Sequence, residues 1–179
     1  MAREVGHGAA GATDAIDVAL AQWARERPDL DARPMSVVGR LHRLGDLWEG
    51  ELRTFFAEAG LGNGDFDVLA SLRRAGAPYR MSPGQLAAST IVTSGAVSKR
   101  VDRLEARGLV RRTVCADDAR GRDVQLTDEG VRFTDELVAR HWANEERLLG
   151  ALDEGEQEQL VGLLRRLLVD LEGPADVPD

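Results

Sequence analysis

Cysteine and lysine each occur once in the 179 residues, at Cys115 and Lys99, and aromatic residues make up only 4% of the chain. A lone cysteine excludes an internal disulfide and a zinc site built from cysteines. The three histidines, His7, His42 and His141, do not have the spacing of a metal site. The sequence therefore predicts neither a bound metal nor a cofactor.

Long hydrophobic runs are absent as well. No apolar stretch approaches the roughly 18–20 residues that a membrane-spanning helix needs, and the N-terminus lacks the apolar core of a secretory signal. The sequence also shows no Ser/His/Asp set, no paired-carboxylate site and no glycine-rich phosphate loop. We expect a cytoplasmic, nucleoid-associated protein that is not an enzyme and has no membrane partner.

Charge is unevenly distributed along the chain. The formal net charge is −8, yet residues 73–122 hold eleven basic and four acidic side chains and so carry +7, which leaves −15 for the remainder. Most of the chain is thus too acidic to attract nucleic acid, and any such binding must be confined to the basic segment.

Hydrophobic periodicity predicts a mainly α-helical fold. Thr13 is the expected N-cap of a first helix that ends near Glu26, with Ile16, Leu20 and Trp23 on one buried stripe. Further helices are expected over about 35–58 and 65–76, and two long helices after the caps at 127 and 153. The last helix has an unusually wide apolar stripe, which indicates a partner outside its own core.

The basic segment has the pattern of a winged helix-turn-helix. Ser82 and Gln85 form a capping box that begins a helix of two turns, and Ser94 or Thr93 caps the next helix, which ends before Gly108. Two β-branched segments, 109–114 and 122–127, then flank a polar turn and form a candidate hairpin. The expected fold is therefore mainly α with a small β-wing.

The second helix of this motif has one apolar and one polar face. At about 100° per residue, Gly95, Lys99 and Asp102 lie opposite Val97 and are flanked by Ser98 and Arg103. Lysine or arginine can donate to guanine in the major groove, and aspartate can accept from cytosine or hold a neighbouring arginine. The alternative is a solvated amphipathic helix.

Other groups near this helix are candidates for contacts with the DNA backbone. Backbone N–H groups at Ser82 and Gln85 can meet a phosphate, and Arg120 and Arg122 at the hairpin tip can reach a minor groove or else form surface ion pairs. The full set of predicted DNA-binding residues is Ser82, Gln85, Ser94, Gly95, Ser98, Lys99, Asp102, Arg103, Arg120 and Arg122.

The run LAASTIVTSGAVSKRVDRLEARGLVRR, followed by Asp-Ala-Arg at 118–120 and LTDEG at 126–130, resembles the MarR family of bacterial transcription regulators. The resemblance extends from about residue 35 to 172. It implies a homodimer formed by N- and C-terminal helices, and one recognition helix for each half of a palindromic operator in double-stranded DNA. The family's wing often has Asp-Arg-Arg, so Ala119 suggests that one wing contact is missing.

The segments QWARERPDLD and FDVLASLRRAGAPYRMSP are similar to the urate-responsive PecS/HucR branch of this family. That resemblance assigns ligand binding to Trp23, Asp67 and Arg100. Arg100 is turned toward the protein body, where its guanidinium needs an anionic partner. This partner is either a bound anion or a carboxylate such as Asp67. Core packing of Trp23 and a helix-dipole role of Asp67 are the structural alternatives.

Together these observations predict five segments: a disordered tail (1–12), N-terminal helices for dimerisation and ligand binding (13–60), the winged helix-turn-helix (61–127), C-terminal dimerisation helices (128–172) and a second disordered tail (173–179). The expected function is a homodimeric repressor released from DNA by a small aromatic anion such as urate. The rivals are a regulator that is ligand-independent or senses oxidants through Cys115, and a helical protein-interaction module.

Overall fold

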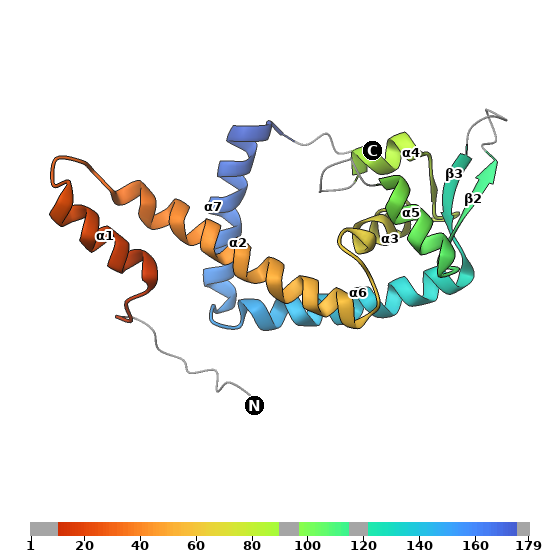
Figure 1. Ribbon diagram of the computed structural model, residues 1–179, viewed down its shortest axis with the longest axis horizontal. Coiled ribbons are helices and arrows are strands. Elements are labelled where there is room, and N and C mark those ends of the chain that lie inside the picture. Colours follow the sequence, from red (N-terminus) through yellow and green to blue (C-terminus); the bar gives the residue numbers. More distant parts are fainter. Residues whose placement is uncertain (1–10, 90–96, 115–121, 175–179) are drawn as a thin grey trace. The chain divides into compact units, whose positions relative to one another are not determined.

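We analysed the protein in a computed structural model that describes residues 11–89, 97–114 and 122–174 (Figure 1). The chain divides into two compact units. One comprises residues 14–141, and the other comprises 1–13 and 142–179; each is considered by itself.

Helices dominate the described part of the chain, as predicted. They are α1 (Ala15–Glu26), α2 (Arg33–Glu58), α3 (Asp65–Arg74), α4 (Pro83–Ser89), α5 (Val97–Ala106), α6 (Asp128–Leu149) and α7 (Glu154–Glu172). Three short strands complete the secondary structure: β1 (Arg80–Met81), β2 (Val110–Val114) and β3 (Arg122–Leu126). The order α3–β1–α4–α5–β2–β3 is that of a winged helix-turn-helix, which confirms the predicted fold class.

Most of the predicted helix caps are present. Ser82 and Gln85 form the capping box of α4, since each backbone N–H donates to the other side chain at 2.9 and 3.2 Å. Thr127 caps α6 by accepting from the N–H of Gly130 at 2.9 Å, and Asp153 forms a capping box at the start of α7. These caps were predictable because each depends on residues within one turn.

The first helix differs from its prediction. Its cap is Asp14, not Thr13, because the Asp14 carboxylate accepts from the N–H of Asp17 while the Asp17 carboxylate accepts from that of Asp14. The expected buried stripe is also wrong, because α1 has no buried residue and Trp23 is 50% exposed. A single apolar stripe gives the orientation of a helix but does not establish what covers it.

The sheet contains one strand that the sequence did not reveal. β3 pairs with both β1 and β2 in antiparallel fashion, so the strand order is β1-β3-β2. In the predicted hairpin, Val110 is paired with Leu126 and Val114 with Arg122. β1 has only two residues, too few for an alternating pattern to identify.

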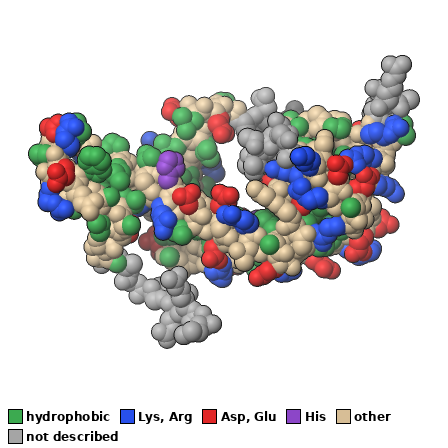
Figure 2. All heavy atoms as spheres, in the orientation of Figure 1, with side chains coloured by type: hydrophobic (Ala, Val, Ile, Leu, Met, Phe, Trp, Pro, Cys, Tyr) green, Lys and Arg blue, Asp and Glu red, His purple; other side chains and the backbone are tan. Residues whose placement is uncertain are grey.

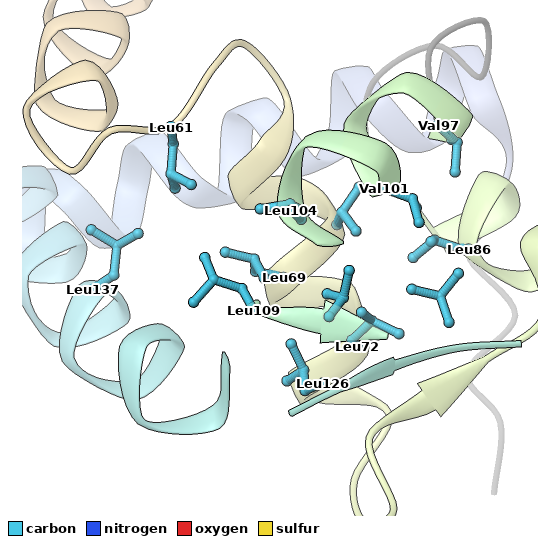
Figure 3. Close-up of a cluster of buried hydrophobic side chains, with 13 residues drawn as sticks. Leu61, Leu69, Leu72, Leu86, Val97, Val101, Leu104, Leu109, Leu126 and Leu137 are labelled. Carbon is cyan, nitrogen blue, oxygen red and sulfur yellow. The ribbon is translucent and has the colours of Figure 1, made fainter. Parts of the chain in front are cut away.

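The hydrophobic core of the larger unit lies within the winged helix-turn-helix (Figure 3). Leucine and valine side chains from α3, α4, α5, α6 and the sheet meet there, and the most completely buried are Val68, Leu69, Leu72, Leu86, Leu104 and Val110. Val97, Val101 and Leu104 of α5 all point into this core. The core therefore fixes which face of α5 is turned outward, and this is the face expected from the periodicity.

The two long N-terminal helices leave much apolar surface uncovered within their unit. Figure 2 shows hydrophobic side chains gathered over α1 and the first half of α2. Val18, Trp23, Leu30, Val37, Val38 and Leu41 are among the exposed residues. In the other unit α7 exposes Val161, Leu163, Leu167, Leu168 and Leu171. No helix in the described ranges is both long and apolar enough to cross a membrane.

Candidate DNA-binding face and ligand cavity

The outward face of α5 presents Ser98 and Lys99 to solvent. Within the described part of the chain, Lys99 takes part in no ion pair. An ammonium group at this position keeps its donors and its charge for an external partner. Of the predicted DNA-binding residues, Lys99 therefore has the geometry that the prediction requires.

Asp102 is not a free acceptor on the same face. Its carboxylate pairs with Arg112 of β2, and the same guanidinium also pairs with Glu105. Asp102 does not hold Arg103, which corrects one of the two roles expected for it. The network instead ties α5 to the first strand of the wing.

Arg103 forms an ion pair that the sequence did not indicate. Its guanidinium donates to Asp65 at the start of α3, at 2.5 Å from Nη2 and 3.3 Å from Nε. Asp65 is only 2% exposed, so this is a partly buried ion pair between two helices. The prediction placed Arg103 beside the groove because helical angle alone does not show which neighbouring element contacts a side chain.

The remaining predicted DNA contacts have different outcomes. The backbone N–H groups of Ser82 and Gln85 are both used inside the capping box of α4, so neither is open to a phosphate. Arg122 is exposed at the start of β3. Ser94, Gly95 and Arg120 lie outside the described residues, as does Cys115.

Arg100 is buried, as the periodicity predicted. It is 6% exposed, and its Nε and Nη1 atoms have no hydrogen-bond partner. Its guanidinium lies so close to Gly64 that a Cβ atom built on that glycine would overlap it. A buried cation with unsatisfied donors is costly, and these two nitrogens find no partner within the described part of the chain.

Asp67 of α3 is the nearby carboxylate that the sequence suggested. Burial raises the pKa of the Asp67 carboxyl above its ordinary value of 3.8, while the charges of Arg100, Arg74 and His141 oppose that shift. Arg100 and Asp67 thus interact through their charges, and neither of the two buried nitrogens of Arg100 donates to Asp67. In the alternative of an Arg100–carboxylate pair, these two nitrogens therefore make no hydrogen bond to Asp67.

A cavity of about 530 Å³ lies beside this pair. Its size is suitable for a small ring compound. Aromatic and aliphatic side chains dominate its walls, which include Trp48, Phe56 and Phe66. Asp67 and Gly64 form part of the lining, so the Arg100 guanidinium stands directly behind the cavity wall.

The cavity does not include Trp23, the third predicted ligand residue. The α2 wall instead carries two aromatic residues, Trp48 and Phe56, with Glu49 and Arg53 nearby. The sequence gave no signal for this cavity, because the walls opposite α2 come from α3 and the preceding turn.

His141 lies buried in an aromatic cluster. It is 9% exposed and packs among Phe55, Phe56 and Phe66, with the Phe66 ring at 4.8 Å between centroids. Phe56 and Phe66 are cavity residues, so His141 supports the aromatic wall from behind. An aromatic cluster drawn from three helices is not visible in the sequence of any one of them.

Comparison with known proteins identifies the family. The family model described as "MarR family" matches residues 59–121. The regulator PecS of Dickeya dadantii is 40% identical over 146 residues, which cover 82% of this chain and 88% of PecS. PecS is described as an HTH-type transcriptional regulator, in agreement with the prediction that the chain is not an enzyme.

Two solved structures extend the comparison. Bordetella bronchiseptica BpsR, studied for regulation of its DNA binding by 6-hydroxynicotinic acid, matches with a TM-score of 0.63 and 25% identity over 74% of this chain and 98% of its own. A mutant of MarR from E. coli in complex with operator DNA shares the fold, with a TM-score of 0.65 and 24% identity over 76% of this chain and 96% of its own. The chain therefore belongs to the MarR family of DNA-binding transcriptional regulators.

Proposed function

We propose that this regulator is a homodimeric repressor that leaves a palindromic operator when a small aromatic anion, such as urate, binds beside Arg100. The single observation that carries the proposal is the buried Arg100 guanidinium, which has two nitrogens without partners behind an aromatic cavity. An anion in that cavity would offer hydrogen-bond acceptors and negative charge close to Arg100, and its ring would pack against Trp48, Phe56 and Phe66. The site of action is the nucleoid in the cytoplasm.

The chemistry of the cavity favours a flat, singly charged ring. The apolar walls favour an aromatic body. Asp67 lies in the lining, and its ionised carboxylate repels negative charge, so a ligand with two negative charges is disfavoured more than a ligand with one. The 6-hydroxynicotinic acid that regulates BpsR belongs to the same chemical class. Trp23 remains a proposed ligand residue only if a second chain brings it to this cavity.

On the DNA side, Lys99 and Ser98 would read the major groove from α5, together with Ser94 and Gly95 before the described part of the helix. Arg120 and Arg122 would contact the backbone from the wing. Because the rest of the chain is acidic, binding should depend strongly on salt concentration.

The first test is calorimetric titration of the purified protein with urate and with 6-hydroxynicotinate. The wild type should bind at least one of them, and Arg100→Gln should lose that binding. Arg43→Gln, an exposed arginine of α2 outside the cavity lining, serves as the matched control and should bind as the wild type does. Equal binding by the wild type and by a folded Arg100→Gln variant would contradict the assigned site.

The second test is anisotropy titration of a labelled duplex that carries the intergenic DNA upstream of the gene, with a scrambled duplex as control. Tight, salt-dependent binding of the upstream duplex alone is expected. Equal binding to both duplexes would exclude a sequence-specific operator there, and no binding to either would favour a protein-interaction module.

A further inference from the structure

The turn before α3 and the first residue of that helix, with the sequence GLGNGD at 60–65, have one side on the cavity and the other on α5. Residues 61–64 line the cavity. Figure 3 shows Leu61 on this segment, near the core that Leu104 of α5 enters. We call residues 60–65 the strap.

Three arginines of α5 and its C-terminal end contact the strap, each at a different glycine. Arg107 donates to the carbonyl oxygen of Gly60 at 2.7 Å. A Cβ atom on Gly62 would lie 3.3 Å from Nε of Arg103, and Arg100 lies against Gly64. The spacing of 100, 103 and 107 places the three arginines on one side of a helix, and that side faces the strap.

Glycine is needed in this segment for two reasons. Gly60 and Gly64 have φ values of +71° and +75°, a region that other residues adopt with strain. At Gly64 a side chain would also displace the Arg100 guanidinium. The strap can therefore lie between the cavity and α5 only because its glycines have no side chains.

Asp65, the last residue of the strap, links the strap to α5. Its buried carboxylate accepts from the N–H of Gly62 at 2.8 Å and from Nη2 of Arg103 at 2.5 Å. One carboxylate thus holds both the bend of the strap and the position of α5. Because a buried charge that loses its partner is strongly disfavoured, the strap and α5 should move together.

We infer that Arg103 is a positioning residue, which orients the recognition helix through Asp65 and does not read bases, and that the strap transmits occupation of the cavity to α5. An anion drawn to Arg100 presses on Leu61 to Gly64, and the shift reaches α5 through Arg103 and Arg107. The second part rests on the proposed function, whereas the role of Arg103 does not.

A double-mutant cycle without ligand tests the role of Arg103. Operator affinity is measured for Asp65→Asn, Arg103→Gln and the double variant at several salt concentrations, after thermal unfolding shows that each is folded. Each single variant should weaken binding by a similar factor, roughly three- to thirtyfold, and the double variant should be no weaker than the singles. The slope of log affinity against log salt should stay that of the wild type.

The inference is overturned if Asp65→Asn leaves operator affinity unchanged or tightens it while Arg103→Gln weakens it. In that case Arg103 contacts DNA itself. A salt slope that falls by about 0.9 in Arg103→Gln, the change expected for one lost phosphate contact, would lead to the same conclusion.

A milder pair of variants tests the strap and avoids the buried charge. A Cβ atom added by Gly62→Ala would meet Asp65 at 3.2 Å and Arg103 at 3.3 Å, whereas Gly50→Ala, on α2 and outside the cavity lining, would meet nothing within 4 Å. At saturating urate, Gly62→Ala should lose most of the effect of urate on operator affinity, and Gly50→Ala should keep it.

The outcomes separate the two proposals. If the wild type binds no aromatic anion, the proposed ligand response fails, but the cycle still decides the role of Arg103. If urate releases the wild type and Gly62→Ala to the same extent, the proposed function stands and transmission through the strap is wrong.

Discussion

Lys99 is the one lysine in a chain of 22 arginines, and it differs from its basic neighbours in what it contacts. Arg103 and Arg112 are each held by carboxylates, and Arg100 is buried. The formal charge of α5 therefore overstates the charge available to DNA. Within the described part of this helix, Lys99 is the exposed cation that takes part in no ion pair.

We expect Lys99→Ala to weaken operator binding by about 1–3 kcal/mol, the discrimination that a good base contact provides, with unchanged thermal stability because the side chain is exposed. Anisotropy titration at fixed salt measures the change. Arg25→Ala, an exposed cation on α1, is the control and should bind as the wild type does. Operator affinity that is the same in both variants would show that Lys99 does not contact the operator.

The Asp67 carboxyl has a raised pKa, and burial is the main cause. Ionisation is therefore less favourable in the folded than in the unfolded chain, so ionised Asp67 lowers stability once the pH is above its folded pKa. Asp67→Asn should be as stable as the wild type near pH 3.5 and should become relatively more stable as the pH rises through that pKa. Chemical denaturation across pH 3.5–7 gives the comparison.

Asp17→Asn is the control of opposite sign. The hydrogen bond from Arg40 is the main cause that lowers the pKa of Asp17 below 3.8, so ionised Asp17 stabilises the fold above pH 3.8 and this contribution is lost as the pH falls through the folded pKa. Asp17→Asn should thus become relatively less stable with rising pH. Parallel curves for the Asp67 and Asp17 variants would contradict at least one of the two assignments.

Helix α1 is attached to α2 mainly by charge. Arg40 of α2 donates to Asp14 at 2.8 Å and to Asp17 at 2.6 Å, and its Nη1 atom donates to the Ser36 carbonyl oxygen at 2.9 Å. Ile16 adds an apolar contact over Gly39, where a Cβ atom would meet it at 3.1 Å. With no buried residue in α1, few other contacts within the unit hold this helix.

Arg40→Gln should release α1. We expect a few-fold faster cleavage after Glu26 by a glutamate-specific protease, and the wild type should show the same increase at high salt, where surface ion pairs are screened. Arg43→Gln, an exposed arginine nearby on α2, should leave the rate unchanged. Equal rates for both variants would show that apolar contacts alone hold α1 in place.

Most helices and strands could be predicted because they depend on residues that are close in the sequence. Most side-chain partners could not be predicted because they lie far away in the sequence. The caps at Ser82, Thr127 and Asp153 depend on residues within one turn, so the sequence contained the complete signal. The partner of Arg103 lies 38 residues away on α3, and no local pattern indicates such a pairing. The spacing of Arg100, Arg103 and Arg107 does put them on one side of the helix, but we expected Arg103 beside the groove, so the surface that the three share was not predicted.

The candidate ligand site was likewise predictable only in part. The burial of Arg100 was predictable from periodicity, because its position is fixed by Val97, Val101 and Leu104. Trp23 had the expected chemistry for the ligand site, but it does not line the cavity in this chain. Trp48 occupies that wall because α2 and α3 approach each other there, which is a property of the fold and not of either helix.

Both units present apolar helices that they do not cover themselves. α1 and α2 expose Trp23, Val38 and Leu41, and in the other unit α7 exposes Leu163 and Leu167. Contiguous exposed apolar surface of this kind is typical of an interface between proteins. The family resemblance and these faces together support a homodimer.

We therefore expect the double variant Leu163→Asp/Leu167→Asp to be monomeric at concentrations where the wild type is dimeric, because two buried carboxylates would oppose the interface. Both side chains are exposed in the single chain, so the winged helix-turn-helix should stay folded. Sedimentation equilibrium measures the mass, with Glu158→Gln on α7 as control. A variant that keeps the dimer mass would place the interface elsewhere.

The most direct measurement of the whole account is the operator affinity of the wild type and of Arg100→Gln, with and without saturating urate, at one salt concentration. The account predicts that urate weakens the wild type roughly 5- to 150-fold, the usual range of coupling between two sites, and leaves Arg100→Gln unaffected. Tight operator binding by the wild type that urate does not change would contradict it.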